Sequence, residues 1–458
     1  MNKQVAKFAQ SLTIFLIFIA SIYRSGKIVE TDVYWQTRAG LDWLSDKTFI
    51  KNDLWSYVPN GEWIPNSWGW NLILAYAYKL SPDYGLFALG FVVTISFLAL
   101  LVVGARRLTS SWNSINHVLA FVLMFAIPIL SIRPALISAY GMLIMLLSTH
   151  AFLKSFQTRP IIMSFVFLIF NVLMINLHLA WPIFLGAAFI GWSGLLLSYL
   201  PYKKALSTIL PLGIAAVIGI LINPLKHHLF SHMLMTFASS TELIYEWKPM
   251  WNEPLYLFGL ILVFAQIRPA KKFKRIRPWA FCSMALAVMG IFAIRYMPWA
   301  LLFSLPAWSF WIRSFQVKKD KFLSIAAIGL ATALIFISYE AITLHGRPSF
   351  IDDIKALPAD CHLIATPQTS GAVVLFRPDV KIFVDSRNEY WGKGRYKLVN
   401  EFMRHPNDDL LTAIEPTCVM AEKNSPVANY FRYRPGWEIK NSGTPSLEVW
   451  SSAAAPQY

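Results

Sequence analysis

Long apolar runs separated by short polar segments fill the first three quarters of the chain. They fall near residues 8–23, 84–103, 117–132, 135–153, 161–177, 182–200, 206–222, 255–267, 279–294, 299–312 and 322–339. A helix needs about 20 apolar residues to cross a bilayer upright, and several of these runs are shorter. The pattern predicts a polytopic α-helical membrane protein with about eleven spans. No small-residue cleavage site follows the first run, so we expect an uncleaved first span rather than a signal peptide.

Basic residues gather in alternate loops between these runs. The clusters are Lys3 and Lys7, Arg106 and Arg107, Lys154 and Arg159, Lys203 and Lys204, residues 268–277, and Lys318, Lys319 and Lys321. Loops rich in Lys and Arg remain in the cytoplasm. The distribution therefore predicts a protein of the cytoplasmic membrane with its N-terminus inside and its C-terminus outside.

Beyond residue 340 the composition becomes that of a water-soluble domain. Short apolar runs at 362–366, 372–376, 381–384, 418–421, 437–439 and 447–450 are typical of strands, and 396–404 and 408–414 of helices. This alternation predicts a small extracytoplasmic α/β domain at 341–458, following a transmembrane bundle at 1–340. Cys361 and Cys418 each open a predicted strand, and the sequence leaves open whether they form a disulfide.

Composition supports a membrane protein and argues against nucleic-acid binding. The chain is 56% hydrophobic and only 14% charged, against about 25% charged residues in soluble domains. Its formal net charge of +16 lies mostly in the loop clusters, which orient a membrane protein rather than form a phosphate-binding surface. Three cysteines are too few for a disulfide scaffold or a Cys-based zinc site.

The first outer loop, residues 24–83, carries two predicted interfacial helices. Residues 33–44 place Trp35, Ala39 and Trp43 on one helical face, with Gln36 and Arg38 away from it. Residues 68–80 are rich in Trp and Tyr, which favour the headgroup region of a bilayer.

Short motifs over nearly the whole chain resemble those of a bacterial group of membrane proteins in the GT-C superfamily of glycosyltransferases. The matching residues are Asp32, Trp35, Gly40, Asp53, Ser56, Tyr57 and Trp68 in the first loop, Glu246, Trp247 and Pro249 in a later loop, Arg295 and Pro298 near a late span, and Ser370, Gly371 and 383–387 in the C-terminal domain. The resemblance implies transfer of a hexose or pentose from a polyprenyl-phosphate-linked donor at the outer membrane face. The acceptor would be a glycan, lipid or protein of the cell envelope.

Under this resemblance, two carboxylates in the first loop are the catalytic candidates. Asp32 would take the proton of the acceptor hydroxyl as general base, and Glu30 is the second catalytic candidate. Either residue could instead stabilise the start of the following helix. Many GT-C enzymes have adjacent acidic residues here, whereas Thr31 separates Glu30 from Asp32, which puts metal dependence and activity in doubt.

Further residues are candidates for contact with the donor phosphate or the acceptor. They are Arg295, Arg133, His178, Glu246, Trp247, Trp35, Asp385 and Arg387. Cations would stabilise the charge that develops on a phosphate leaving group. Each also has a structural interpretation, such as a salt bridge for Glu246, or for Asp385 with Arg387. The sequence leaves open whether Asp32 and Glu246 hold a divalent cation, Mg²⁺ or Mn²⁺, between them. Two carboxylates without a histidine are a weak indication of a metal site.

Two other function classes stand beside the transferase. A non-catalytic GT-C-like scaffold, or an assembly protein that binds glycan or lipid, would retain the fold without the chemistry. A transporter is disfavoured because the spans contain few charged residues and no matched pair of broken helices.

Overall fold

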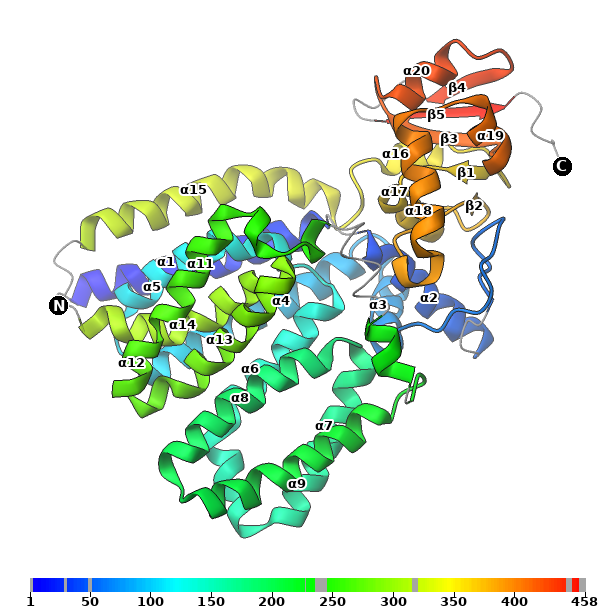
Figure 1. Ribbon diagram of the computed structural model, residues 1–458. Coiled ribbons are helices and arrows are strands. Elements are labelled where there is room, and N and C mark those ends of the chain that lie inside the picture. The colour runs from blue at the N-terminus through cyan, green and yellow to red at the C-terminus, as the bar shows by residue number, and fades with distance from the viewer. Residues whose placement is uncertain are drawn as a thin grey trace. The chain divides into compact units, whose positions relative to one another are not determined.

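The computed structural model describes residues 3–28, 31–47, 52–226, 228–234, 245–314, 320–441 and 447–452 (Figure 1). The chain forms two compact units. The first, here called the bundle, contains Met1–Lys27, Leu86–Met233 and Ile244–His345. The second, here called the α/β unit, contains Ile28–Gly85 and Gly346–Tyr458.

The bundle is built of helices. They are α1 (Lys3–Gly26), α4 (Gly85–Leu108), α5 (Trp112–Ala126), α6 (Pro134–Thr158), α7 (Pro160–Leu177), α8 (Trp181–Tyr199), α9 (Tyr202–Leu221), α11 (Pro254–Ala265), α12 (Ile267–Lys272), α13 (Arg277–Phe292), α14 (Met297–Ser314) and α15 (Asp320–Leu344), with single 3₁₀ turns η1 (Ile127–Ile129), η2 (Tyr245–Trp247), η3 (Met250–Asn252), η4 (Lys274–Ile276) and η5 (Ile294–Tyr296). Helices α1 and α15 lie side by side (Figure 1). Gly26 permits their close approach, because an added Cβ would lie 2.1 Å from the carbonyl oxygen of Ala341.

All eleven predicted spans are helical, but not all have the length and composition of a membrane span. Within the described residues, nine helices are long and apolar enough to cross a membrane. The predicted spans at 255–267 and 299–312 are the exceptions. They form α11, which has 12 residues, and α14, which contains Pro298, Pro306 and Arg313. Twelve residues extend about 18 Å, well short of a hydrocarbon core of about 30 Å.

The α/β unit contains a five-stranded mixed sheet in the order β2-β1-β3-β5-β4. Its strands are β1 (His362–Ile364), β2 (Lys381–Ile382), β3 (Cys418–Glu422), β4 (Trp437–Asn441) and β5 (Leu447–Ser452), and its helices are α2 (Asp32–Asp46), α3 (Trp68–Leu80), α16 (Ile351–Lys355), α17 (Pro367–Phe376), α18 (Asn388–Arg404), α19 (Asp408–Ile414) and α20 (Pro426–Arg432). β1 pairs in parallel with β2 and β3, and β5 pairs antiparallel with β3 and β4. The predicted C-terminal α/β fold is confirmed.

One predicted strand is wrong: residues 372–376 belong to helix α17. Thr366 caps this helix, since its side chain accepts a hydrogen bond from the backbone N–H of Thr369, and Pro367 occupies the first helical turn. The apolar run that follows is buried within the helix. A short apolar run cannot distinguish a buried strand from a buried helix, so the capping residues were the better signal.

The division of the chain also differs from the predicted one, because residues 28–85 pack with the C-terminal domain. Ser56 bridges in parallel to Ile382, and the backbone N–H of Ile382 donates to the carbonyl of Trp55 at 2.9 Å. The Tyr57 hydroxyl donates to the carbonyl of Ile414 at 3.0 Å. The first loop therefore extends the α/β unit rather than the bundle.

Both predicted loop helices form, but α2 is not buried on one face alone. It packs against α3 and α17, and Gln36, expected to point away from the apolar face, is only 4% exposed. Gly40 lets α2 and α3 approach closely, because an added Cβ would lie 2.1 Å from the carbonyl oxygen of Asn71. In this unit α2 is a core helix.

Cys361 and Cys418 form a disulfide with their Cα atoms 5.9 Å apart, since they stand on the paired strands β1 and β3 or immediately before them. The bond joins positions 57 residues apart. We expect the Cys361→Ser, Cys418→Ser double variant to lose about 2–4 kcal/mol of unfolding free energy, because the unfolded chain regains loop entropy. Denaturant unfolding of oxidised and reduced protein measures this. Reductant should destabilise the wild type but not the double variant. Equal stability of the oxidised wild type and the double variant would contradict this prediction.

Candidate functional site

Asp32 is the first residue of α2, and two side chains of the α/β unit meet its carboxylate. The Ser386 hydroxyl donates to Oδ1 of Asp32. The indole Nε1–H of Trp35 lies 3.2 Å from the same oxygen and 3.1 Å from Oγ of Ser386. Asp32 remains half-exposed. The structure thus brings together the catalytic candidate Asp32, the predicted binding residue Trp35, and Ser386 of the C-terminal 383–387 motif, for which the sequence indicates no role.

A buried ion network holds the loop that carries Ser386. Nη2 of Arg387 lies 2.8 Å from Oδ2 of Asp385 and 3.1 Å from Oδ1 of Asp53, and none of the three side chains is exposed. Four aromatic rings surround the guanidinium group at 4.5–5.2 Å from their centres, those of Trp55, Trp63, Tyr390 and Trp391. Cation–π attraction adds to the ion pairs in such a setting.

The charges in this network are strongly coupled. Burial raises the pKa of Asp53, and the charge of Arg387 offsets only part of that effect. Burial by itself would lower the pKa of Arg387, but the charges of Asp385 and Asp53 outweigh it and raise the pKa. Asp385 and Arg387, predicted as ligand contacts, are instead fully buried and paired. Their burial favours the alternative salt-bridge interpretation, in which they position Ser386.

A second cluster lies in the bundle, where one carboxylate joins two arginines. Glu246, in η2, lies 3.2 Å from Nη1 of Arg133 and 3.2 Å from Nη1 of Arg295. Arg133 directly precedes α6, and Arg295 is in η5. The guanidinium of Arg295 also lies over the ring of Trp247, 4.5 Å from its centre. Four of the predicted residues therefore meet at one end of the bundle.

These pairings fix the charge states of the cluster. Burial would raise the pKa of Glu246, but the nearby charges of Arg133 and Arg295 outweigh it, and the pKa falls below the usual range. Burial lowers the pKa of Arg133, and the charge of Glu246 opposes that shift. At neutral pH Glu246 is a carboxylate and both arginines are cations, so these three groups together carry one positive charge.

His178, at the end of α7, belongs to the same part of the bundle. Its Nδ1 lies 2.7 Å from Oγ of Ser138. Burial, with the charges of Arg295 and Arg133, lowers the pKa of His178 to about 3. His178 is therefore a neutral imidazole at physiological pH.

This shift predicts how His178 responds to acid. The folded-state pKa lies below the unfolded value of about 6.5, so the unfolded state binds more protons between about pH 3 and 6.5. The contribution of His178 to stability is present above about pH 6.5 and lost as the pH falls below it. Imidazole ¹⁵N shifts should show His178 neutral from pH 8 to pH 5, with His178→Gln assigning the signal. Protonation near pH 6.5 would contradict this environment.

Arg24 is a buried cation that the motif analysis missed. It ends α1, is 2% exposed, and donates to the carbonyls of Pro128 at 3.1 Å and Leu130 at 3.4 Å. The pKa of Arg133 is lowered mainly by burial and then by the charge of Arg295, and the charge of Arg24 lowers it further. One feature of the sequence could have identified Arg24. It is an arginine at the predicted outer end of a span, and the outer loops are otherwise poor in basic residues.

The metal hypothesis gains no support from the described residues. Among them, no group of three or more His, Cys, Asp or Glu side chains could hold a metal ion. Both oxygens of Glu246 face guanidinium groups, an arrangement that disfavours cation binding there. Asp32 belongs to the other unit. Glu30 lies outside the described residues.

The many-helix bundle and the α/β unit that includes the first loop together make up a fold that this chain shares with solved membrane proteins. No family model and no curated protein matches the sequence. Among solved structures, the chain is similar to ArnT from Cupriavidus metallidurans bound to undecaprenyl phosphate, with 11% identity, full coverage of both chains and a TM-score of 0.56. The resemblance predicted from the motifs is confirmed at the level of the fold.

A second solved protein has the same fold. The archaeal oligosaccharyltransferase AglB from Archaeoglobus fulgidus, in complex with an inhibitory peptide and a dolichol-phosphate, is 12% identical over 98% of this chain and 75% of its own, with a TM-score of 0.52. Its apo form is 11% identical over 90% of this chain and 69% of its own, also with a TM-score of 0.52.

Proposed function

We propose that this protein is a membrane glycosyltransferase that moves a sugar from a polyprenyl-phosphate-linked donor to an acceptor at the outer face of the cytoplasmic membrane. The observation that carries the proposal is the Arg133–Glu246–Arg295 cluster, found in a fold whose solved examples hold undecaprenyl phosphate and a dolichol-phosphate.

The arginine cluster suits a phosphate that arrives from the membrane. A guanidinium group offers a rigid fork of donors that matches phosphate oxygens. Glu246 holds the two guanidinium groups near each other before any donor binds. When the bond from sugar to phosphate breaks, negative charge develops on the phosphate, and fixed cations stabilise it without reorganisation.

Asp32 suits the proton transfer that the same reaction needs. The acceptor hydroxyl must lose a proton as it attacks the anomeric carbon, and a carboxylate within hydrogen-bond reach can take it. Ser386 and Trp35 both direct hydrogen atoms to Oδ1 of Asp32 and so orient the carboxylate. The buried Arg387 network keeps Ser386 in place.

Two observations support an outer-face reaction. The basic clusters in alternate loops predict that the first loop and the C-terminal domain lie outside the cytoplasm. The Cys361–Cys418 disulfide fits an oxidising compartment. A glycan, lipid or protein of the cell envelope is the acceptor class accessible there.

A non-catalytic relative is the second candidate, because Thr31 interrupts the acidic pair that many GT-C enzymes carry. Such a protein would bind the polyprenyl phosphate but transfer nothing. Binding and transfer must therefore be measured separately.

Carrier binding tests the arginine cluster. We expect Arg295→Ala to weaken binding of undecaprenyl phosphate at least tenfold, because charge-assisted hydrogen bonds contribute about 1.5–3 kcal/mol each. Native mass spectrometry of the purified protein in detergent measures the bound lipid. Glu246 still has Arg133 as a partner in this variant, so the bundle should remain folded.

The matched control is Arg313→Ala, which removes an exposed arginine from the last turn of α14. It should bind the carrier as the wild type does. Equal affinity of Arg295→Ala and wild type would remove the arginine cluster from the proposed donor site.

A further inference from the structure

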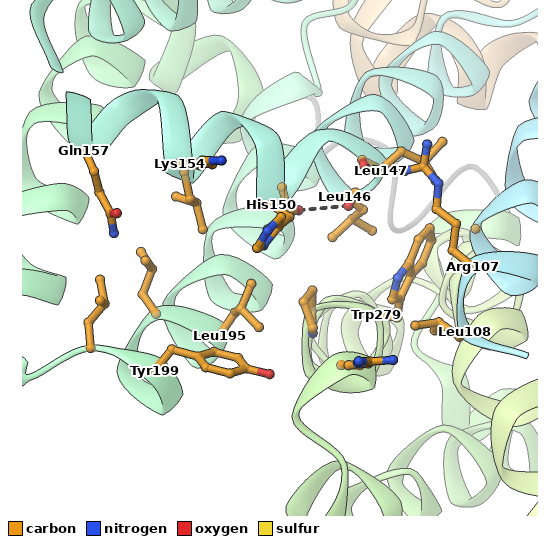
Figure 2. A pocket seen from close by; sticks show the side chains of 17 residues that line it. Arg107, Leu108, Leu146, Leu147, His150, Lys154, Gln157, Leu195, Tyr199 and Trp279 are labelled. Carbon is orange, nitrogen blue, oxygen red and sulfur yellow. Dashed lines mark hydrogen bonds between the residues drawn. The ribbon is translucent and has the colours of Figure 1, made fainter. Parts of the chain in front are cut away.

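A cavity of about 650 Å³ lies within the bundle, away from the arginine cluster. Its walls come from the C-terminal part of α4, the second half of α6, the end of α8 and the start of α13 (Figure 2). Lys154, in its lining, follows Arg133 by 21 residues along α6, which corresponds to roughly 32 Å at about 1.5 Å per residue. That distance is close to the thickness of a hydrocarbon core, so the cavity and the arginine cluster lie toward opposite membrane faces.

Apolar side chains form most of the cavity wall. Leu146, Leu153, Leu195, Leu196 and Trp279 are among them. They come from helices that the bundle packs together, and Leu153 and Leu196 are buried in one small core cluster with Ala205. Such a wall can bury hydrocarbon chains, but it offers few favourable contacts to a small hydrophilic anion.

Basic and polar side chains form the rim. Arg107, Lys154 and Arg275 line the cavity and are exposed, and no Asp or Glu is present among its described lining residues. His150, Lys154 and Gln157 follow one another along one face of α6, with Leu195 and Tyr199 across the opening (Figure 2). These residues lie at the helix ends where the basic loop clusters gather, the predicted cytoplasmic face.

We propose that this cavity binds one anionic glycerophospholipid of the inner leaflet, with its headgroup phosphate at the basic rim and its acyl chains along the leucines. The proposal is separate from sugar transfer, because its residues and its membrane face differ from those of the donor site. Charge decides between lipid classes. A zwitterionic headgroup would bring an ammonium or choline group to a rim of cations without a carboxylate, whereas an anionic headgroup meets only opposite charge.

Native mass spectrometry of the full-length protein tests this with phosphatidylglycerol and phosphatidylcholine of identical acyl chains. The wild type should retain one phosphatidylglycerol at least tenfold more tightly than the Arg107→Ala, Lys154→Ala, Arg275→Ala triple variant, since each basic residue near an anionic lipid contributes about a fivefold factor. Phosphatidylcholine should not distinguish the two proteins. The charge-conserving triple variant with Arg107→Lys, Lys154→Arg and Arg275→Lys should recover most of the binding.

Two controls separate the cavity from a general effect of basic charge. The Lys203→Ala, Lys204→Ala variant removes exposed cations at the same predicted face but outside the cavity, and it should retain phosphatidylglycerol as the wild type does. Thermal unfolding should show phosphatidylglycerol raising the midpoint of the wild type but not of the alanine triple variant.

Three outcomes would overturn the proposal. They are equal retention of phosphatidylglycerol by wild type and alanine triple variant, equal retention of the two lipid classes by the wild type, and displacement of the lipid by inorganic phosphate or undecaprenyl phosphate at concentrations well below its own. The last outcome would assign the cavity to a different anion.

Discussion

Replacing Asp32 by Asn is expected to reduce sugar transfer by about 10²–10⁴-fold, the usual contribution of a general base. The amide of Asn cannot take a proton from the acceptor hydroxyl, yet it fills the same space and can still accept the hydrogen bonds of Ser386 and Trp35. Helix α2 loses an acidic residue from its first turn, which costs only about 0.3–1 kcal/mol. The rate of transfer should therefore fall while protein abundance and the disulfide remain.

Asp46→Asn is the matched control, because Asp46 is an exposed carboxylate at the other end of the same helix. Its transfer rate should equal that of the wild type. A purely structural role for Asp32 would give a small loss of stability and an unchanged rate constant at saturating donor, and that result would remove the general-base assignment.

Replacing Arg387 by Met is expected to cost the α/β unit about 3–5 kcal/mol of unfolding free energy. The side chains of Asp385 and Asp53 are wholly buried, so removing Arg387 takes away the ion-pair partner that the two carboxylates share. Met occupies a similar volume, so the loss reports charge rather than an empty space. Limited proteolysis and chemical denaturation of the full-length protein measure the effect.

Lys440→Met provides the comparison for an exposed ion pair. Lys440 pairs with Glu438 at 2.9 Å, but both side chains are well exposed, so the pair should contribute at most about 1 kcal/mol. Equal destabilisation by the two substitutions would show that the Arg387 network is not the anchor of this unit. A tolerated Arg387→Met would also break the argument that this network positions Ser386.

The helices could be predicted well from the sequence. Which segments of the chain pack into the same unit could not. Apolar runs and basic loops depend on local composition, so the spans and the α/β character of residues 341–458 could be read directly. The union of residues 28–85 with the C-terminal domain depends on pairings such as Ser56 with Ile382, more than 300 positions apart. The hydrophobic periodicity of each segment depends only on nearby residues, so it cannot indicate a pairing between distant segments. The apolar run at 372–376 is consistent with a strand or a helix, and the cap at Thr366 is the feature that makes it helical.

The candidate site likewise has a part that could be predicted from the sequence and a part that could not. Motifs identified Asp32, Glu246 and Arg295 as residue types suited to the chemistry, and the structure adds how they are paired. That Glu246 joins Arg133 to Arg295 depends on three segments that only the fold brings together. The sequence offers a signal for both Ser386 and Arg24, but their roles follow from contacts that only the fold shows. Ser386 contacts Asp32, and Arg24 contacts the carbonyls of Pro128 and Leu130. The burial of Asp385 and Arg387, which favours a supporting role for them, cannot be read from a short motif.

The most direct test of the central claim is a transfer assay with the purified protein in lipid. Radiolabelled polyprenyl-phosphate sugars serve as donors, cell-envelope fractions serve as acceptors, and Asp32→Asn runs beside the wild type. The account predicts label in the acceptor for the wild type and at most about 1% of that rate for Asp32→Asn. A folded wild-type protein that binds undecaprenyl phosphate but transfers label from no donor would contradict it and identify a non-catalytic member of the fold.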